Sequence, residues 1–275
     1  MALSDRARRN HEQLFPSHKS TLKVTDPELI DVFDNFAFDE VIARSRLDTK
    51  TRVMLILAGI IGANGVAEFR VMADTALNIG VTPVELKEIV YQSVPYVGMA
   101  RAFDFIHATN DVLTQKGVQL PLEGQSTTDP ETRLEKGLAV QKAAFGRMID
   151  ELYERSPRDQ LHIQHFLSAN CFGDYYTRAG LDLQFRELVT LSILIALDPD
   201  RSRRDGHTGQ RPRSSQHKRR EWPRGAARRH YPITAVGRIS QDPERAECSQ
   251  RSCTRTMIRT TSCSTKEEMV WLVVS

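Results

Sequence analysis

Glu187 is the acidic residue best placed to perform acid catalysis. It directly follows Arg186 and precedes the apolar run LVTLSILIAL at 188–197. Burial against such a run disfavours the charged form of a carboxyl group, so its pKa rises and it can deliver a proton near neutral pH. The alternative is a structural acid that caps its helix or pairs with Arg186 or Arg178.

Cys171 is a second candidate, as a thiol that reduces peroxides. That chemistry needs a lowered thiol pKa and normally a second thiol that resolves the oxidised form, and no other cysteine is nearby. Because cysteine is among the most often buried residue types, we favour a packed, structural Cys171. Tyr175, Tyr176 and His165 could line a pocket with it, although aromatic residues at these spacings are more often core or interface.

The sequence carries no motif for a metal or a redox centre. The remaining cysteines, Cys248, Cys253 and Cys263, show neither CxxC spacing nor the spacing of zinc ligands. We therefore expect no structural disulfide, no dithiol site, no metal ion and no cofactor.

Helices must position these residues, because the first 200 positions carry helical patterns. Thr82-Pro83-Val84-Glu85 combines a capping hydroxyl, a proline at the first helical position and the glutamate of a capping box. Apolar residues recur at helical spacing from Val66 to Leu77, before the stop signal Asn78-Ile79-Gly80, and again over 99–113. The sequence therefore predicts an all-α body.

A further helix is expected after a linker at 116–128. Asp129-Pro130 predicts its start. This helix would bury five apolar side chains, those of Leu134, Leu138, Phe145, Ile149 and Leu152.

Two segments of the body resemble each other. FDEVIARSRLDTKTR at 38–52 aligns with FGDYYTRAGLDLQFR at 172–186 at a constant offset of 134 residues. Each segment then runs into a predicted buried helix. We infer two related helical units in tandem, a first at 1–115 and a second at 129–197 that is cut short.

Two strings resemble the carboxymuconolactone decarboxylase family. ALNIGVTPVELKEIVYQSVPYVGMARA at 76–102 is similar to its pattern A-x-x-x-G-x-T-x-x-E-(I/L)-x-E followed by Y-x-G-x-x-(R/A), and residues 168–197 resemble the second unit of tandem members. The resemblance implies an alkylhydroperoxidase D-like helical bundle that assembles into homo-oligomers, usually rings. It also implies a small-molecule substrate and either lactone-acid decarboxylation or thiol-dependent hydroperoxide reduction of the peroxiredoxin type.

The first unit departs from the family at two positions. Met72 stands where the family often has a His, and Val53 stands where a Glu commonly follows the motif arginine. In the second unit Glu187 does follow Arg186. The resemblance therefore favours Glu187 as the catalytic acid, with Cys171 as the thiol alternative. The candidates for substrate binding are Arg186, Tyr175, Tyr176 and His165.

Composition changes abruptly near residue 198. Residues 201–275 carry 17 Lys/Arg against 7 Asp/Glu, one Leu and no Phe, whereas the whole chain has a formal net charge of only +3. Such a segment cannot build an ordinary core, so we expect a basic, disordered tail at 198–275. Its arginine clusters, with Trp222 and Tyr231, would suit nucleic acid. The protein would then be a non-catalytic helical oligomerisation module with a basic nucleic-acid-binding tail.

A shifted reading frame explains the tail in more detail. We therefore do not favour a nucleic-acid partner. Read one base further on, the codons of residues 234–248 permit L-P-(L/W)-V-G-Y-P-R-T-L-N-A-L-N, which parallels residues 94–101. Those of residues 208–213 permit Q-V-x-G-H, which supplies the family His. We infer that the sequence from about 198 is a frameshifted translation of the missing half of the second unit. Without those helices we expect an exposed Glu187 with an ordinary pKa, and weak or absent catalysis.

No segment predicts membrane attachment. The start MALSDRARRN is polar and leads into no apolar stretch of signal-peptide length. The longest apolar run, at 188–197, is about half of the roughly 20 residues that a membrane helix needs. We therefore expect a cytoplasmic protein.

Overall fold

The computed structural model describes residues 2–16 and 20–197, and the predicted tail and its frameshift lie outside these residues. Within the described part the regular elements are all helical, which confirms the all-α prediction. In chain order they are α1 (Asp5–Leu14), α2 (Leu22–Thr25), α3 (Pro27–Asn35), the π-helix η1 (Phe36–Glu40), α4 (Val41–Arg44), α5 (Thr49–Ala63), α6 (Val66–Asn78), α7 (Pro83–Val97), α8 (Met99–Gln115), α9 (Arg133–Phe145), α10 (Met148–Arg155), α11 (Leu161–Phe166), the π-helix η2 (Leu167–Tyr176) and α12 (Leu183–Leu197).

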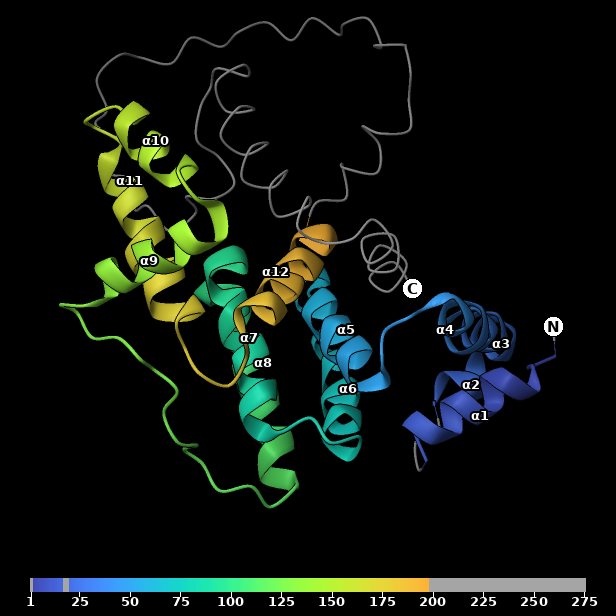
Figure 1. The fold of residues 1–275 in the computed structure, drawn as a ribbon. Helices are drawn as coiled ribbons and strands as arrows, with labels where there is room; N and C mark the ends of the chain where they lie inside the picture. The colour runs from blue at the N-terminus through green and yellow to red at the C-terminus, as the bar shows by residue number, and fades with distance from the viewer. Residues whose placement is uncertain (1, 17–19, 198–275) are drawn as a thin grey trace, which may run out of the picture.

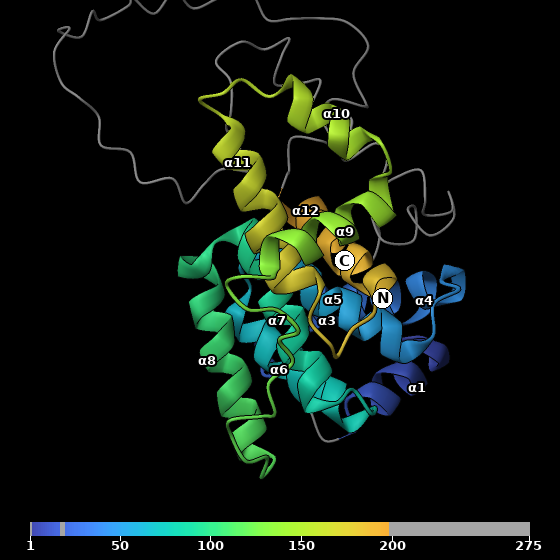
Figure 2. The ribbon, with the colours of Figure 1, turned by 60° about the vertical axis from the view of Figure 1, so that its left-hand side comes forward.

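The α5–α12 pair forms the centre of the molecule. α5 packs against α12, α6 and α7, and α7 also contacts α8, α12 and η2. Figures 1 and 2 place α1–α4 on one side of this centre and α9–α11 on another. The core is apolar because large side chains from several helices meet there with no exposed surface, among them Leu55, Leu57, Ile61, Phe69 and Phe105. None of the described helices is long and apolar enough to cross a membrane.

The capping box predicted for α7 is present. The Glu85 backbone N–H donates to Thr82 Oγ1 at 3.2 Å, and the Thr82 N–H donates to the Glu85 carboxylate at 2.7 Å. Pro83 occupies the first turn, where its missing N–H costs nothing. This box fixes the start of the helix that carries much of the site described below.

The helix predicted from Asp129-Pro130 is wrong in its bounds. Residues 130–132 form a turn, in which the Asp129 carboxylate accepts the Thr132 N–H at 2.8 Å, and α9 begins only at Arg133. The last residue of α9 is Phe145. Gly146 follows with a φ of +61°, a left-handed conformation that terminates the helix before α10 begins. Of the five predicted core residues, Phe145 and Ile149 are buried, whereas Leu134, Leu138 and Leu152 are only partly buried.

The segments 38–52 and 172–186 share local structure. Phe38 lies in η1 and Phe172 in η2. Asp48 Oδ1 accepts the Thr51 N–H at 2.9 Å, and Asp182 Oδ1 accepts the Phe185 N–H at 2.7 Å. Each aspartate therefore caps the long helix that follows, by the same hydrogen bond.

The two long helices meet at corresponding residues. A Cβ added to Gly62 of α5 would lie 2.6 Å from the Ile193 carbonyl oxygen and 2.7 Å from Ala196 Cβ. Ala196 is the counterpart of Gly62 at the offset of 134 residues. α5 and α12 can approach this closely because Gly62 has no Cβ.

Candidate functional site

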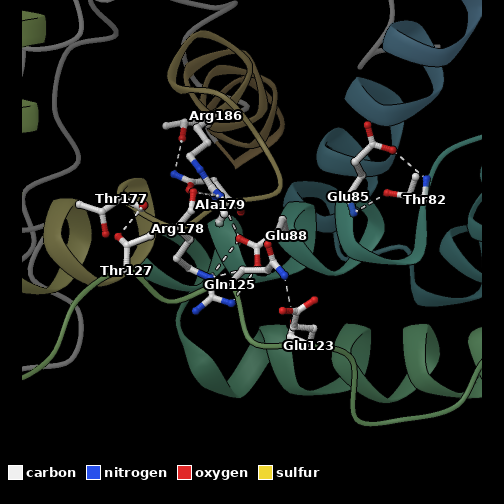
Figure 3. Close-up of polar contacts among 12 residues, drawn as sticks. Thr82, Glu85, Glu88, Glu123, Gln125, Thr127, Thr177, Arg178, Ala179 and Arg186 are labelled. Atoms are coloured by element: carbon white, nitrogen blue, oxygen red, sulfur yellow. Dashed lines mark hydrogen bonds and ion pairs between the residues drawn. The ribbon is translucent and has the colours of Figure 1, made fainter.

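A buried ion pair joins α7 to the segment around α12. Glu88 is 1% exposed and Arg186 is fully buried. Arg186 Nη2 donates to Glu88 Oε2 at 2.9 Å, and Arg178 donates to the same carboxylate through Nε at 3.0 Å and Nη2 at 2.8 Å. Figure 3 shows both arginines reaching Glu88. Two guanidinium groups share one carboxylate, so this cluster carries a net positive charge.

The loop that carries Arg178 is held by the linker before α9. The Ala179 N–H donates to the Gln125 carbonyl at 2.9 Å, and Thr127 Oγ1 donates to the Thr177 carbonyl at 2.8 Å. Arg186 Nη2 also donates to the Ala179 carbonyl at 2.9 Å. Figure 3 shows the linker running beside this loop. The linker therefore helps to fix the position of the Arg178 guanidinium.

Hydrogen bonds continue from Arg186 to the aromatic residues of η2. Arg186 Nη1 donates to Gln92 Oε1 at 3.1 Å, and Gln92 Nε2 donates to Thr190 Oγ1 at 3.2 Å. Thr190 Oγ1 lies 3.0 Å from Tyr176 Oη. We call these residues the donor chain, together with Tyr96, whose contact with Tyr176 is described next. Its members are Arg186, Gln92, Thr190, Tyr176 and Tyr96.

The far end of the donor chain reaches the cysteine. Tyr176 Oη lies 2.9 Å from Tyr96 Oη, which in turn lies 3.6 Å from Cys171 Sγ. Cys171 is 6% exposed. The structure thus brings Cys171, Tyr176 and Arg186 into one connected polar cluster.

Helical spacing explains why these side chains meet. Glu88, Gln92 and Tyr96 are four residues apart on α7, so they form one stripe along that helix. Arg186 and Thr190 are likewise four apart on α12 and face this stripe. The site is therefore built by two helices from distant parts of the sequence.

Glu187 lies half-buried at the start of α12, beside this cluster. Burial raises the pKa of its carboxyl group above the ordinary value of 4.5. Its charge is close enough to Tyr176 to contribute to the raised pKa of that hydroxyl. The expectation of an exposed Glu187 with an ordinary pKa is therefore wrong, because α12 and its neighbours already remove much of the surrounding water.

The structural alternative for Glu187 named two partners that are engaged elsewhere. Arg178 and Arg186 both form their ion pairs with Glu88. The sequence predicted that these arginines pair with an acid, but the acid that it named, Glu187, is not their partner. The acid that neutralises them comes from α7, ninety-eight residues before Arg186 in the chain.

The tyrosines of the site stay protonated at physiological pH. Burial, together with the charges of the other cluster members, raises the pKa of Tyr96 and of Tyr176. Tyr175 is half-buried, and burial and the nearby Asp174 raise its pKa. These hydroxyl groups therefore act as hydrogen-bond donors rather than as bases.

The ring contact of His165 is with a residue outside this cluster. His165 is exposed on α11, and its ring packs against Tyr153 with a centroid distance of 5.6 Å. Tyr153 in turn bonds Ser168 at 2.7 Å. Among the described residues no group of histidine, cysteine and acidic side chains could hold a metal ion.

The two similar segments differ where chemistry is concerned. At the offset of 134 residues, four polar side chains of the cluster have apolar counterparts: Cys171 with Ala37, Tyr176 with Ile42, Glu187 with Val53, and Thr190 with Ile56. The framework residues Arg178 and Arg186 keep arginine counterparts, Arg44 and Arg52. Of each such pair of positions, therefore, only the one in residues 171–190 carries a polar group.

Sequence reasoning missed four members of the site, namely Glu88, Gln92, Tyr96 and Thr190. A signal was present, because Glu88 is the last acid of the family pattern and the three α7 residues repeat every four positions. Their partner helix could not be identified from spacing, since the contact is long-range.

Comparison with known proteins finds one family. A model of the carboxymuconolactone decarboxylase family matches residues 27–111. The matched part runs from the start of α3 into α8. A search of curated proteins finds no match. The matched region includes the α7 stripe and ends well before Cys171 and Glu187.

Proposed function

We propose that this carboxymuconolactone decarboxylase-like protein decarboxylates a small lactone acid, with Glu187 as the proton donor. The observation that carries the proposal is the half-buried Glu187 with a raised pKa, beside a polar cluster that α7 and α12 build together. We further propose that the protein works in the cytoplasm as a homo-oligomer.

The charges of the site favour an anionic substrate. Arg178 and Arg186 carry two positive charges against the one carboxylate of Glu88. The side chain of Arg178 is 18% exposed, so this excess charge can attract a substrate carboxylate from solvent. A lactone acid carries such a group.

The reaction needs a stabilised electron pair and then a proton. When carbon dioxide leaves, the pair of the broken carbon–carbon bond is delocalised onto the lactone carbonyl oxygen. Protonated Glu187 then delivers its proton to carbon, and the resulting carboxylate regains a proton from solvent. A raised pKa keeps a larger fraction of Glu187 in the protonated form that this step requires.

The test is a decarboxylation assay on the 275-residue chain, on a chain with the reading frame restored, and on the Glu187→Gln variant of each. We expect weak activity in the given chain and higher activity in the restored one. Glu187→Gln should lower kcat by about 10²- to 10⁴-fold, the usual contribution of a general acid. Glu68→Gln, at an exposed position on α6, is the matched control. Full activity in Glu187→Gln would remove this residue from the mechanism.

A thiol-dependent hydroperoxide reductase is the second candidate. Its supporting observation is the Cys171 sulfur, which lies 3.6 Å from the Tyr96 hydroxyl and so has a donor beside it. Loss of hydroperoxide reduction in Cys171→Ala, with no loss in Glu187→Gln, would move the assignment to this chemistry.

A further inference from the structure

We propose that the free edge of the Arg178 guanidinium group, together with Lys87 and Tyr91, binds the substrate carboxylate that is lost in the reaction. The inference rests on the proposed decarboxylation and names the subsite for that group. All three side chains are only partly buried. Glu88 joins Arg178 to Arg186, the residue before Glu187, so the subsite lies beside the start of α12.

One edge of the Arg178 guanidinium group is already occupied. Its Nε and Nη2 atoms donate to the Glu88 carboxylate at 3.0 Å and 2.8 Å. An arginine side chain has five N–H donors, so the second Nη2 hydrogen and both Nη1 hydrogens remain. No acceptor among the described residues takes them. These donors form the Nη1–Nη2 edge, and such an edge matches the two oxygens of a carboxylate.

This free edge is open to solvent and fixed in place. The Arg178 side chain is 18% exposed. Among the described residues, Arg186 Nε is the buried side-chain nitrogen that lacks a hydrogen-bond partner, so the unpaired Arg178 Nη1 keeps contact with water. Glu88 holds the occupied edge, and the linker holds the loop through the Ala179 N–H. A carboxylate therefore meets donors that are both accessible and preorganised.

A second cation shares the aromatic neighbour of Arg178. Arg178 Cζ lies 5.2 Å from the centroid of the Tyr91 ring, and Lys87 Nζ lies 5.9 Å from the same centroid. Lys87 and Tyr91 are four residues apart on α7, so they lie on one side of that helix. The Lys87 ammonium donates to the neutral Asn110 Oδ1 at 2.5 Å, and no acidic side chain in the described part of the chain pairs with it. An anion at Arg178 is therefore also attracted by Lys87.

Two tyrosine hydroxyls lie within reach of the Arg178 charge. Burial raises the pKa of Tyr91, and the positive charge of Arg178 opposes this rise. Burial and Asp174 raise the pKa of Tyr175, on which Arg178 acts in the same way. Both hydroxyls therefore stay protonated at neutral pH and can donate hydrogen bonds. Tyr175, which the sequence predicted as a substrate-binding residue, thus belongs to the surroundings of this subsite.

A carboxylate subsite of this kind distinguishes substrate from product. The substrate arrives with a carboxylate, which leaves as carbon dioxide. The product lacks this group, so it loses the charge-assisted hydrogen bonds to Arg178 and the attraction of Lys87. We therefore expect the substrate to bind more tightly than the product.

The test uses 2-furoate, a carboxylate on a five-membered oxygen ring, and its neutral amide 2-furamide, with the full 275-residue chain. Titration followed by NMR of the ligand gives both affinities. We expect 2-furoate to bind about 10-fold or more tightly than 2-furamide, because hydrogen bonds to a charged group are the stronger ones. Arg178→Lys keeps the charge and removes the paired donors, so it should weaken 2-furoate binding by about 10-fold.

A second variant guards against a folding defect in Arg178→Lys. Lys87→Gln removes a charge, and its amide can still donate to Asn110. It should weaken 2-furoate binding by about 2- to 5-fold and leave 2-furamide unaffected. Lys142→Gln is the matched control, because it removes the same charge from α9, where Lys142 pairs with Asp150, and should change neither affinity.

Three results would overturn the carboxylate subsite. They are equal affinities of the wild type for 2-furoate and 2-furamide, no binding of 2-furoate by the wild type, and the same 2-furoate affinity in the wild type, Arg178→Lys and Lys87→Gln. Unaltered helical circular dichroism would show that the variants fold.

The kinetic experiment separates this proposal from the proposed function. In an active chain Arg178→Lys should raise KM by about 10-fold with a smaller change in kcat, because the bonds to the carboxylate are already present in the bound substrate. Binding of 2-furoate that depends on Arg178, in a chain without decarboxylase activity, would overturn the reaction and support the subsite. An unchanged KM in Arg178→Lys would overturn the subsite and leave the reaction standing.

Discussion

Glu88 is the residue on which the charge balance of the site depends. It compensates two arginines, one of them fully buried. We predict that Glu88→Gln lowers the free energy of unfolding by about 3–5 kcal/mol, because it leaves a buried guanidinium group without its counter-charge. Urea denaturation measures this. Glu12→Gln, at an exposed position of α1, should change stability by less than about 0.5 kcal/mol. A similar small change in Glu88→Gln would show that the arginines find other partners.

Glu187 should make stability depend on pH in a direction opposite to that of most surface acids. Its folded-state pKa lies above 4.5, so the native chain holds this proton more tightly than the unfolded chain does. Its contribution to stability is therefore complete below about pH 4.5 and is lost as the pH rises through the folded-state value. The difference in unfolding free energy between wild type and Glu187→Gln, measured from pH 4 to pH 8, should show this fall. A flat difference would contradict a raised pKa.

Single residues of the site were only partly predictable. Arg186, Glu187, Cys171 and Tyr176 could be named because a local pattern carries them. Their partners Glu88 and Gln92 lie more than ninety residues away in the chain, and periodicity says which face of a helix is buried without saying against what.

Close packing of α9 against η2 rests on two glycines. A Cβ on Gly173 would lie 2.1 Å from the Arg133 carbonyl oxygen, and one on Gly137 would lie 1.9 Å from the Ser168 carbonyl oxygen. We predict that Gly173→Ala lowers the free energy of unfolding by about 1–3 kcal/mol or more, because backbone must move to admit the methyl group.

Gly124→Ala is the matched control for this prediction. It adds the same methyl group in the linker, where nothing lies within 4 Å. Thermal melts followed by circular dichroism compare the two variants. Equal melting temperatures would show that α9 and η2 separate at little cost.

Element boundaries followed the sequence where local chemistry decides them. The start of α7 was predictable because Thr82 and Glu85 satisfy each other's backbone within one turn. The break at Gly146 was missed, because Phe145 and Ile149 are both buried and keep the helical period across it. Periodicity reports burial, and it does not report a turn that preserves the same buried face.

For the whole molecule, the shifted frame is one sequence prediction that stays untested. We predict that the gene, read one base further on across codons 195–250, encodes the pattern L-P-x-V-G-Y-P-R-T-L-N-A-L-N. The expectation follows from the ordered matches to residues 94–101. Resequencing decides it, and an intact frame without this pattern would show that the basic tail is a genuine part of the protein.

The contact of Gly62 with its own counterpart, Ala196, has a consequence for how this molecule could diverge. In a symmetric pair of identical chains every substitution occurs twice, so a tyrosine or a glutamate introduced on one side must also be accommodated on the other. Here both partners of the α5–α12 contact lie in one chain. Each side can therefore change alone. One side therefore carries the polar residues Tyr176 and Glu187, whereas the corresponding positions on the other side carry the apolar residues Ile42 and Val53.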